Sequence, residues 1–200
     1  FDAALLARAA ALRARIVAAG VTKYNLGGGA AALPGFGGRP RLLVLGQVED
    51  DASIRHGAIG AVRTNLGLLR AVRAAHPGAA LIFRPHPDVR SGYRRGHVPA
   101  RLLHGLADHV AEAGDVAALY GQVEAVHCIT SLGGFEALLR GLPVTCWGAP
   151  FYAGWGLTAD MAPIPRRGIP RSLDALVAAT LLLYPRYTHP LTGAPCTAED

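Results

Sequence analysis

The sequence predicts an α/β protein in which helices cover both faces of a parallel sheet. The first supporting observation is a set of short, continuously apolar runs, the pattern of strands that are buried on both faces. The second is that these runs alternate with segments whose apolar residues recur at helical spacing. The third is that polar residues and glycines follow the runs, as expected where the carboxyl ends of parallel strands form a ligand site.

Each expected element has a local reason in the sequence. Strands are expected where apolar residues run without interruption, at residues 41–46, 80–83, 123–129 and 143–146. Helices are expected at residues 2–19, 57–75, 99–107 and 115–121, from residue 130 to near Gly141, and at 172–184. Gly20 stops the first helix, and Ser172 is a good N-cap for the last.

A stretch rich in Gly and Pro, residues 27–40, is typical of a linker. We therefore expect an N-terminal helix and linker over residues 1–40, a Rossmann-like domain over 41–185 and a C-terminal tail over 186–200. The start shows no separate charged and apolar regions of a secretory signal. Because the chain begins without Met and inside a helix, we expect it to be part of a longer protein.

Composition narrows the classes of function. Apolar residues make up 51% of the chain and charged residues 17%, which is typical of a globular protein, and no apolar run approaches the ~20 residues that span a bilayer. The net charge of +6 comes almost entirely from Arg, which favours an anionic partner such as a phosphate, a sugar carboxylate or a lipid headgroup. The Arg residues are scattered, without a stacking platform or zinc-finger spacing, so no nucleic-acid partner is expected.

The cysteine and histidine patterns indicate neither a disulfide framework nor a metal site. Cys128, Cys146 and Cys196 form no Cys-x-x-Cys pair and are odd in number, which fits a reducing, cytoplasmic setting. The histidines are scattered along the sequence and lack the spacing of metal ligands, so no metal is expected.

The segment Thr-Ser-Leu-Gly-Gly-Phe-Glu follows the third expected strand and opens a helix. The free N–H groups and the dipole of a helix N-terminus favour an anion. We expect a phosphate here, bound by Thr130, Ser131, Gly133 and Gly134, and ribose hydroxyls on Glu136. The alternative is an ordinary Ser N-cap followed by glycines that permit tight packing.

The segment Arg-Pro-His-Pro-Asp follows the second expected strand. Prolines on both sides of His86 fix the backbone, so the ring is aimed in one direction. A held imidazole can hydrogen-bond to or protonate a leaving phosphate, and Arg84 adds positive charge. Pro87 is expected at the same site. The alternative is a Pro-rich turn with an incidental His.

The segment Gln-Val-Glu-Asp-Asp-Ala-Ser follows the first expected strand. Three consecutive like charges repel one another, so a function is expected for at least one of Glu49, Asp50 and Asp51, as a nucleophile, a general base or a metal ligand. Gln47 belongs to the same loop. The alternative is a solvated acidic loop that caps the next helix.

Two Trp residues, Phe151 and Tyr152 are interspersed with glycines in residues 147–156. Aromatic faces pack against the C–H surfaces of sugars, and glycines allow a loop to close over a substrate. We therefore expect Tyr152 and Trp155 at the ligand site. The alternative is a group of aromatic residues that covers the edge of the sheet.

In this order, the motifs resemble those of the bacterial capsule polysaccharide biosynthesis/export family. Its well-known members are retaining glycosyltransferases of β-linked 3-deoxy-manno-octulosonate (Kdo). The resemblance covers nearly the whole chain and rests on residues 23–25, 46–54, 84–88, 130–138, 148–158 and 183–187.

The resemblance implies that the chain is one half of a GT-B-type enzyme. It implies a CMP-Kdo donor rather than a resident cofactor, a lipid-linked Kdo acceptor and a role in capsule synthesis at the inner membrane, with possible peripheral membrane association. By position, Asp51 matches the acid of the family's Gln-x-x-x-Asp-x-Ser pattern and becomes the candidate nucleophile, with Glu49 and Asp50 as base or supporting carboxylates. His86 matches the element that supports the CMP phosphate. Thr130, Ser131 and Glu136 match the loop that grips the nucleotide.

Two residues depart from the family pattern, and other functions remain open. Arg84 stands where Lys is expected, and Gly133 stands where Thr is common.

Arg166 and Arg167 are further candidates for binding the Kdo carboxylate. Because a GT-B enzyme needs two Rossmann-like halves, the chain is expected to need a second one. The alternatives are an enzyme for a UDP-sugar, either a GT-B transferase or an epimerase, and a non-catalytic capsule export or assembly module.

Overall fold

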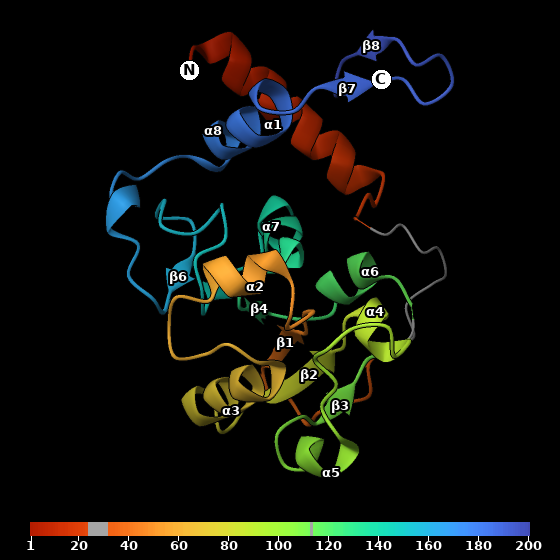
Figure 1. Cartoon of the computed structure of the whole chain (residues 1–200), viewed down its shortest axis with the longest axis vertical. Helices are drawn as coiled ribbons and strands as arrows, with labels where there is room; N and C mark the ends of the chain where they lie inside the picture. Colours follow the sequence, from red (N-terminus) through yellow and green to blue (C-terminus); the bar gives the residue numbers. More distant parts are fainter. Residues whose placement is uncertain (24–31, 113) are drawn as a thin grey trace. The chain divides into compact units, whose positions relative to one another are not determined.

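A computed structural model of the chain describes residues 1–23, 32–112 and 114–200 (Figure 1). Tyr24, Asn25 and residues 27–31 of the expected linker lie outside the described residues. No described helix combines the length and the apolar character that are needed to cross a membrane.

Contacts divide the chain into two compact units, which we call the terminal unit and the sheet unit. The terminal unit combines Phe1–Val21 with Pro170–Asp200, and the sheet unit is Thr22–Ile169. The predicted domain boundaries therefore need correction, because the last helix, which we placed with the sheet in residues 41–185, belongs with the first helix.

The terminal unit is built on helix α1 (Ala3–Ala18) and helix α8 (Leu173–Val177), which continues as the π-helix η2 (Ala178–Leu183). Asp2 caps α1 by accepting a hydrogen bond from the Leu5 N–H at 2.8 Å, and Ser172 caps α8 as predicted. The short strands β7 (Tyr187–Thr188) and β8 (Pro195–Cys196) pair antiparallel beyond η2. The apolar side of α8 packs against α1, which is why the two ends of the sequence form one unit.

The sheet unit confirms the predicted α/β fold. In the described chain, six parallel strands lie in the order β3-β2-β1-β4-β5-β6. The strands are β1 (Arg41–Leu45), β2 (Ala80–Arg84), β3 (His109–Val110), β4 (Ala125–Cys128), β5 (Val144–Cys146) and β6 (Ala159–Asp160). The order reverses between β1 and β4, the position at which Rossmann-like sheets bind ligands. The four predicted strands are present, and the two that were not predicted, β3 and β6, have only two residues each.

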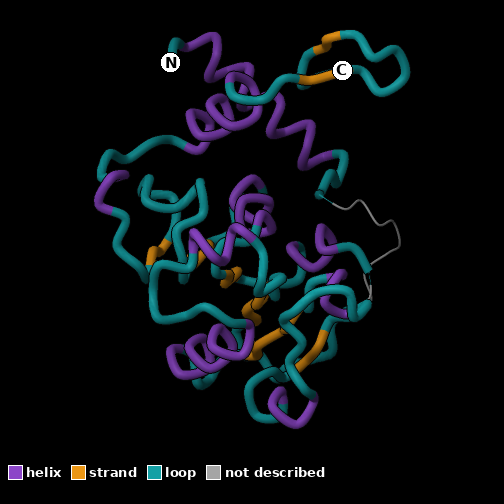
Figure 2. Tube along the Cα trace, in the orientation of Figure 1, coloured by secondary structure: helices purple, strands orange, loops and turns teal. Residues whose placement is uncertain are grey.

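Burial of both faces explains why the central strands are continuously apolar. Leu42 and Val44 of β1 pack into one core with Leu68 of helix α3 (Asn65–Ala75). Side chains alternate between the faces of a sheet, so Leu43 and Ile82 point to the other face, and both are fully buried there. Figure 2 shows how strands and helices alternate along the chain.

The remaining helices connect the strands, and several are shorter than predicted. They are α2 (Ala52–Gly57), α4 (Pro87–Arg90), α5 (Ala100–Leu103), α6 (Val116–Tyr120), α7 (Leu132–Leu139) and the 3-10 helix η1 (Pro165–Arg167). The predicted helix 57–75 is wrong in its first part, because α2 ends at Gly57 and α3 begins again after the N-cap Thr64. Gly57 allows a close approach, since a Cβ there would lie 2.8 Å from the Thr130 methyl group.

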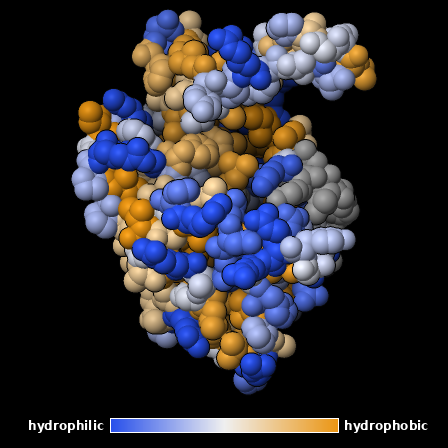
Figure 3. Space-filling model, in the orientation of Figure 1, coloured by the Kyte–Doolittle hydropathy of each residue, from blue (hydrophilic) through white to orange (hydrophobic). Residues whose placement is uncertain are grey.

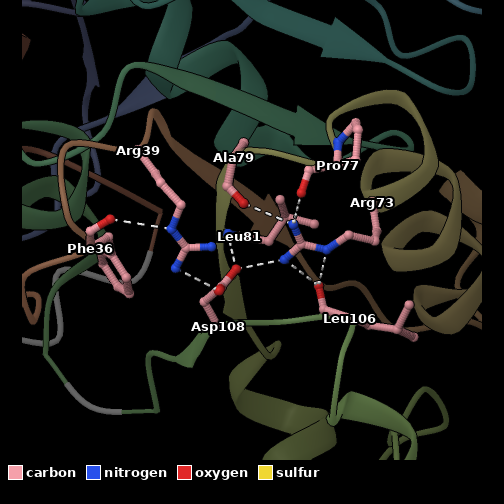
Figure 4. Close-up of polar contacts among 8 residues, drawn as sticks. All are labelled: Phe36, Arg39, Arg73, Pro77, Ala79, Leu81, Leu106 and Asp108. Carbon is pink, nitrogen blue, oxygen red and sulfur yellow. Dashed lines mark hydrogen bonds and ion pairs between the residues drawn. The ribbon is translucent and has the colours of Figure 1, made fainter.

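A polar network closes the amino-terminal edge of the sheet (Figure 4). The Asp108 carboxylate accepts a hydrogen bond from the Leu81 N–H at 2.9 Å and forms ion pairs with Arg39 and Arg73. Arg73 also donates to the carbonyl oxygens of Ala79, the residue before β2, and of Leu106. We call Arg39, Arg73 and Asp108 the amino-edge network.

Candidate functional site

A pocket of about 290 Å³ lies at the carboxyl ends of the strands, where the strand order reverses. The loops that follow β1, β2, β3, β4 and β5 all contribute to it. The predicted site residues that line it are Gln47, Asp51, Arg84, His86, Pro87, Thr130, Ser131, Gly133 and Glu136. The structure thus brings together the first three segments singled out from the sequence, and the fourth, residues 147–156, contributes Phe151.

Asp51 is the N-cap of α2 and faces the pocket. Its Oδ1 accepts a hydrogen bond from the Ala52 N–H at 2.6 Å, and its Oδ2 accepts one from the Ser53 hydroxyl at 3.2 Å. These two bonds orient the carboxylate, while the side chain stays exposed. Hydrophilic side chains gather over α2 and its neighbouring loops in the view of Figure 3.

Glu49 and Asp50, predicted as base or supporting carboxylates, are each bonded to another residue of the protein. The Glu49 Oε1 accepts a hydrogen bond from the Asn65 N–H at 2.6 Å, at the start of α3. Asp50 is half-exposed and forms an ion pair with Arg94 at 3.1 Å. Neither carboxylate lines the pocket as the described residues define it. Of the three consecutive acids, the structure therefore leaves Asp51 as the candidate for chemistry.

Gln47 joins two loops of the pocket through its side-chain amide. The Gln47 Nε2 donates to the Thr130 hydroxyl at 2.9 Å, and the Gln47 Oε1 accepts from the Thr130 N–H at 2.8 Å. Both residues are buried. β1 and β4 are the adjacent strands between which the strand order reverses. The two hydrogen bonds between Gln47 and Thr130 therefore fix the segments that leave these strands.

His86 is held in one orientation at the N-cap of α4. Its Nδ1 accepts a hydrogen bond from the Asp88 N–H at 3.2 Å, so the neutral ring has its proton on Nε2. Burial lowers the pKa of His86, and the positive charges of Lys23 and Arg94 lower it further. The negative charges of Asp88 and Asp51 act in the opposite direction but do not cancel the fall. The ring is therefore a neutral hydrogen-bond donor at neutral pH, and it lies within the electrostatic reach of Asp51.

Arg84 lines the pocket, but its guanidinium binds the protein. It donates to the carbonyl oxygens of Ala111 at 2.7 Å and Gly114 at 2.6 Å, and its pKa is lowered by burial. These bonds fix the loop after β3, and the role of Arg84 as the positive charge for an anion stays a prediction. Arg167 is used in the same way, because it donates to the carbonyl oxygens of Pro150 and Ala153.

The N-terminus of α7 opens into the pocket beside these groups. Ser131 caps the helix, and its Oγ accepts from the Gly133 N–H at 3.2 Å. A Cβ on Gly133 would lie 2.7 Å from the Leu45 Cδ1 and 3.1 Å from the Tyr120 hydroxyl oxygen, so the helix packs tightly here. The backbone of α7 thus approaches β1 closely and presents a helix N-terminus, which favours an anion.

Glu136 lies one turn into α7, and its carboxylate is buried. It accepts hydrogen bonds from the Lys23 N–H at 2.7 Å and the Tyr120 hydroxyl at 3.2 Å. Burial raises the pKa of Glu136, and these hydrogen bonds oppose that rise. The carboxylate therefore fixes the segment that contains Lys23 at the pocket, and its contact with ribose stays a prediction.

The aromatic segment is oriented differently from the prediction. Tyr152 is completely buried, and its hydroxyl donates to the Ser131 carbonyl, while Phe151 lines the pocket with an exposed fraction of 40%. The Trp155 Nε1–H donates to the Phe151 carbonyl at 2.8 Å. Gly134 packs beneath Tyr152. In the described part of the chain, Tyr152, Trp155 and Gly134 thus support the pocket from outside, contrary to the prediction that they bind the ligand.

Several lining residues were missed by the sequence analysis, including Lys23, Asp115, Val116, Tyr120 and Phe151. Asp115, Val116 and Tyr120 follow β3, a strand of two residues that leaves no apolar run in the sequence. The sequence predicted a helix at residues 115–121, which α6 confirms, but no sequence pattern marked these residues as part of a site. Phe151 was visible as an aromatic residue, but nothing in the sequence distinguished its direction from that of Tyr152.

Comparison with known proteins identifies a family. The family described as "Capsule polysaccharide biosynthesis protein" matches residues 36–187. The capsule polysaccharide modification protein LipA of Neisseria meningitidis is 49% identical over 179 residues, which are 90% of this chain and 25% of LipA. The lipopolysaccharide-processing protein LpsZ of Rhizobium meliloti is 45% identical over 200 residues, which are 99% of this chain and 45% of LpsZ.

Two solved structures from Thermosulfurimonas dismutans have the same fold. KpsC described as a β-Kdo 2,7 transferase superposes with a TM-score of 0.84 at 39% identity, over 100% of this chain and 60% of that one. KpsC described as a β-Kdo 2,4 transferase gives a TM-score of 0.83 at 31% identity, over 98% and 61%. The chain thus spans between a quarter and three fifths of the relatives that it matches.

Proposed function

Because the chain belongs to the capsule polysaccharide biosynthesis protein family, we propose that its sheet unit is the donor-binding half of a retaining Kdo transferase of GT-B type. The donor is CMP-Kdo, and the acceptor is a lipid-linked Kdo chain in capsule synthesis. The names of the two KpsC structures support the transferred sugar. The free state of all three cysteines fits a cytoplasmic site, where the lipid-linked acceptor would bring the protein to the inner membrane.

The observation that supports this function most strongly is the composition of one pocket. A carboxylate, a neutral imidazole donor and a helix N-terminus line the same cavity, supplied by Asp51, His86 and Ser131. This combination suits a phosphate-linked sugar, because the imidazole and the helix bind the phosphate while the carboxylate faces the sugar. Glu136 and Tyr120 on the side of β3 suit the nucleoside.

The proposed mechanism is a double displacement. The Asp51 carboxylate attacks the anomeric carbon of Kdo, a carbon–oxygen bond forms, and the bond to the CMP phosphate breaks. His86 donates a hydrogen bond from Nε2 to the departing phosphate, and the dipole of α7 stabilises its charge. An acceptor hydroxyl then displaces Asp51 and releases its proton to solvent, so the two inversions give net retention.

The pocket accounts for part of such a donor. Its volume of about 290 Å³ lies at the lower limit of ligand sites, which hold about 300–1,000 Å³. The KpsC structures extend well beyond the part that matches this chain, which covers 60% of one of them. We therefore assign the rest of the donor and the acceptor to a second Rossmann-like half of the same protein.

The test is transfer by the intact protein that contains this chain, incubated with CMP-Kdo and a synthetic Kdo acceptor, with mass and linkage analysis of the product. Asp51→Ala should lower the rate by about 10³-fold or more, as expected for loss of a nucleophile. Asp50→Ala is the matched control from the same loop and should retain most of the rate. An Asp51→Ala protein that keeps most of its rate would refute the nucleophile.

Calorimetry distinguishes the proposed function from its rivals. The proposal requires that the intact protein binds CMP in preference to UDP. Preference for UDP would indicate an enzyme for a UDP-sugar, and failure to bind any nucleotide would indicate a non-catalytic export or assembly module. Either result would overturn the proposed donor.

A further inference from the structure

Asn65 is a buried polar side chain that lies outside the pocket but is bonded to its walls. It is the first residue of α3, and only 1% of its surface is exposed. Its Oδ1 accepts a hydrogen bond from the Gln47 N–H at 2.8 Å, and its Nδ2 donates to the carbonyl oxygens of Gln47 and Gly96, both at 2.8 Å. A buried amide with three such bonds cannot reach a ligand, so its effect must pass through its partners.

The two hydrogen bonds between Asn65 and the Gln47 backbone take the place of the bonds that a neighbouring strand would make. β1 ends at Leu45, and beyond it the backbone groups of Gln47 have no strand to pair with. Buried backbone groups require partners, and the Asn65 amide binds both the N–H and the C=O of this one residue. The amide therefore fixes the direction in which the chain leaves β1 towards Asp51.

A further hydrogen bond connects the loop after β1 to helix α3. The Asn65 N–H donates to the Glu49 Oε1 at 2.6 Å, and a carboxylate at the N-terminus of α3 is favoured by the helix dipole. The loop is thus attached to α3 at Gln47 and at Glu49, four and two residues before Asp51. This arrangement also gives Glu49 a definite role that does not require contact with the ligand.

Two other segments join at this position. The Gln47 side chain binds Thr130 after β4, as described above. The Glu49 N–H donates to the Arg95 carbonyl at 3.0 Å, and Asn65 binds the next carbonyl, that of Gly96. Residues 95–96 follow helix α4, whose N-cap is His86. The side-chain amides of Asn65 and Gln47 therefore together link the segments that supply the proposed nucleophile, the imidazole and the phosphate-binding helix.

We infer that Asn65 is a positioning residue for the reaction, which acts through Gln47 and Glu49 to hold Asp51 at the sugar; the inference rests on the proposed function. Positioning of reacting groups is sensitive, since a displacement of about 1 Å can reduce a rate by about 10²-fold. Loss of the Asn65 bonds should therefore slow the transfer step more than it weakens binding of the donor.

The experiment uses Asn65→Ala in the intact protein, with steady-state kinetics and amide hydrogen exchange. We expect kcat to fall by about 10- to 100-fold with KM for CMP-Kdo changed by less than about threefold. We expect the amides of Gln47 and Thr130 to exchange at least about tenfold faster than any change in global stability explains. Exchange is measured without substrate, so it tests the positioning role even if the protein does not transfer Kdo.

The matched control is Asp108→Ala in the amino-edge network (Figure 4). Asp108 also binds a backbone N–H and links neighbouring segments, but it does so at the other edge of the sheet. We expect it to lower stability without a change in kcat or in exchange at Gln47. If Asp108→Ala lowers kcat as much as Asn65→Ala does, Asn65 is only structural and the inference is overturned.

Gly96→Ala is a second variant, in case Asn65→Ala does not fold. Gly96 has a φ of +128°, and a Cβ there would lie 2.7 Å from the Asn65 Nδ2 and from the Gln47 carbonyl oxygen. The added methyl group disturbs the same bonds from a surface loop that does not line the pocket in the described chain. It should reproduce the fall in kcat and the faster exchange at Gln47. Normal kcat and normal exchange in Gly96→Ala would contradict the inference.

Discussion

Substitution of His127 should make the sheet unit less sensitive to acid. His127 lies in β4, only 2% of its surface is exposed, and its Nδ1 has no hydrogen-bond partner among the described residues. Its ring packs edge-on against that of His76, with 5.1 Å between the centroids. Burial lowers the pKa of His127 from 6.5 to about 4, and the nearby His76 contributes to the lowering.

The magnitude follows from the two pKa values. The unfolded chain binds a proton near pH 6.5, whereas the folded chain does so only near pH 4, so protons favour unfolding between these values. The contribution of His127 to stability is intact above pH 6.5 and is lost progressively as the pH falls towards 4. Between pH 7 and pH 5 the loss is about 2 kcal/mol of unfolding free energy.

The assay is urea unfolding of wild type and His127→Leu at pH 7 and pH 5, followed by Trp fluorescence. Both Trp residues of the chain, Trp147 and Trp155, belong to the sheet unit and report on it alone. The urea midpoint of the variant minus that of wild type should be about 1 M larger at pH 5 than at pH 7. His104→Leu, at an exposed His, should follow wild type. If wild type and His127→Leu lose stability in parallel, burial does not keep the ring neutral.

Two further predictions test the corrected assignments at the pocket. Phe151→Ala should weaken CMP-Kdo binding by about threefold to tenfold in calorimetry. Tyr152→Phe should leave binding unchanged. It should lower the unfolding free energy by about 1–2 kcal/mol, because the Ser131 carbonyl loses its buried donor. The opposite pattern would restore Tyr152 as the ligand-binding residue. Arg84→Lys should cost about 1–3 kcal/mol in urea unfolding although the charge is kept, because an ammonium cannot bind the two carbonyl groups in the same way; equal stability would contradict this role.

The sheet could be predicted from the sequence because burial on both faces leaves a direct signal. Every residue of β2 is buried, and the corresponding run of apolar residues is continuous. The ends of such runs also locate the site, since the carboxyl edge of a parallel sheet gathers the loops that follow its strands. Strands of two residues, such as β3, leave no comparable signal, and the pocket residues that follow them were missed.

The direction of side chains within loops could not be predicted, because loops lack a period that relates sequence to direction. Phe151 and Tyr152 are adjacent, yet one lines the pocket and the other is fully buried. The pairing of distant segments was equally hidden. The last helix was assigned to the sheet from its place in the chain, whereas its apolar side packs on α1 near the other end of the sequence.

The three consecutive acids show how the structure gives chemically similar neighbours different tasks. Glu49 binds the N-terminus of α3, Asp50 binds Arg94, and Asp51 caps α2 with its carboxylate in the pocket. The cost of placing like charges side by side is reduced because the first two have partners of their own: a helix dipole for Glu49 and a guanidinium for Asp50. The repulsion that made the segment conspicuous in the sequence therefore does not require three catalytic groups. It requires only that the two supporting acids have partners, which leaves Asp51 as the acid that faces the pocket.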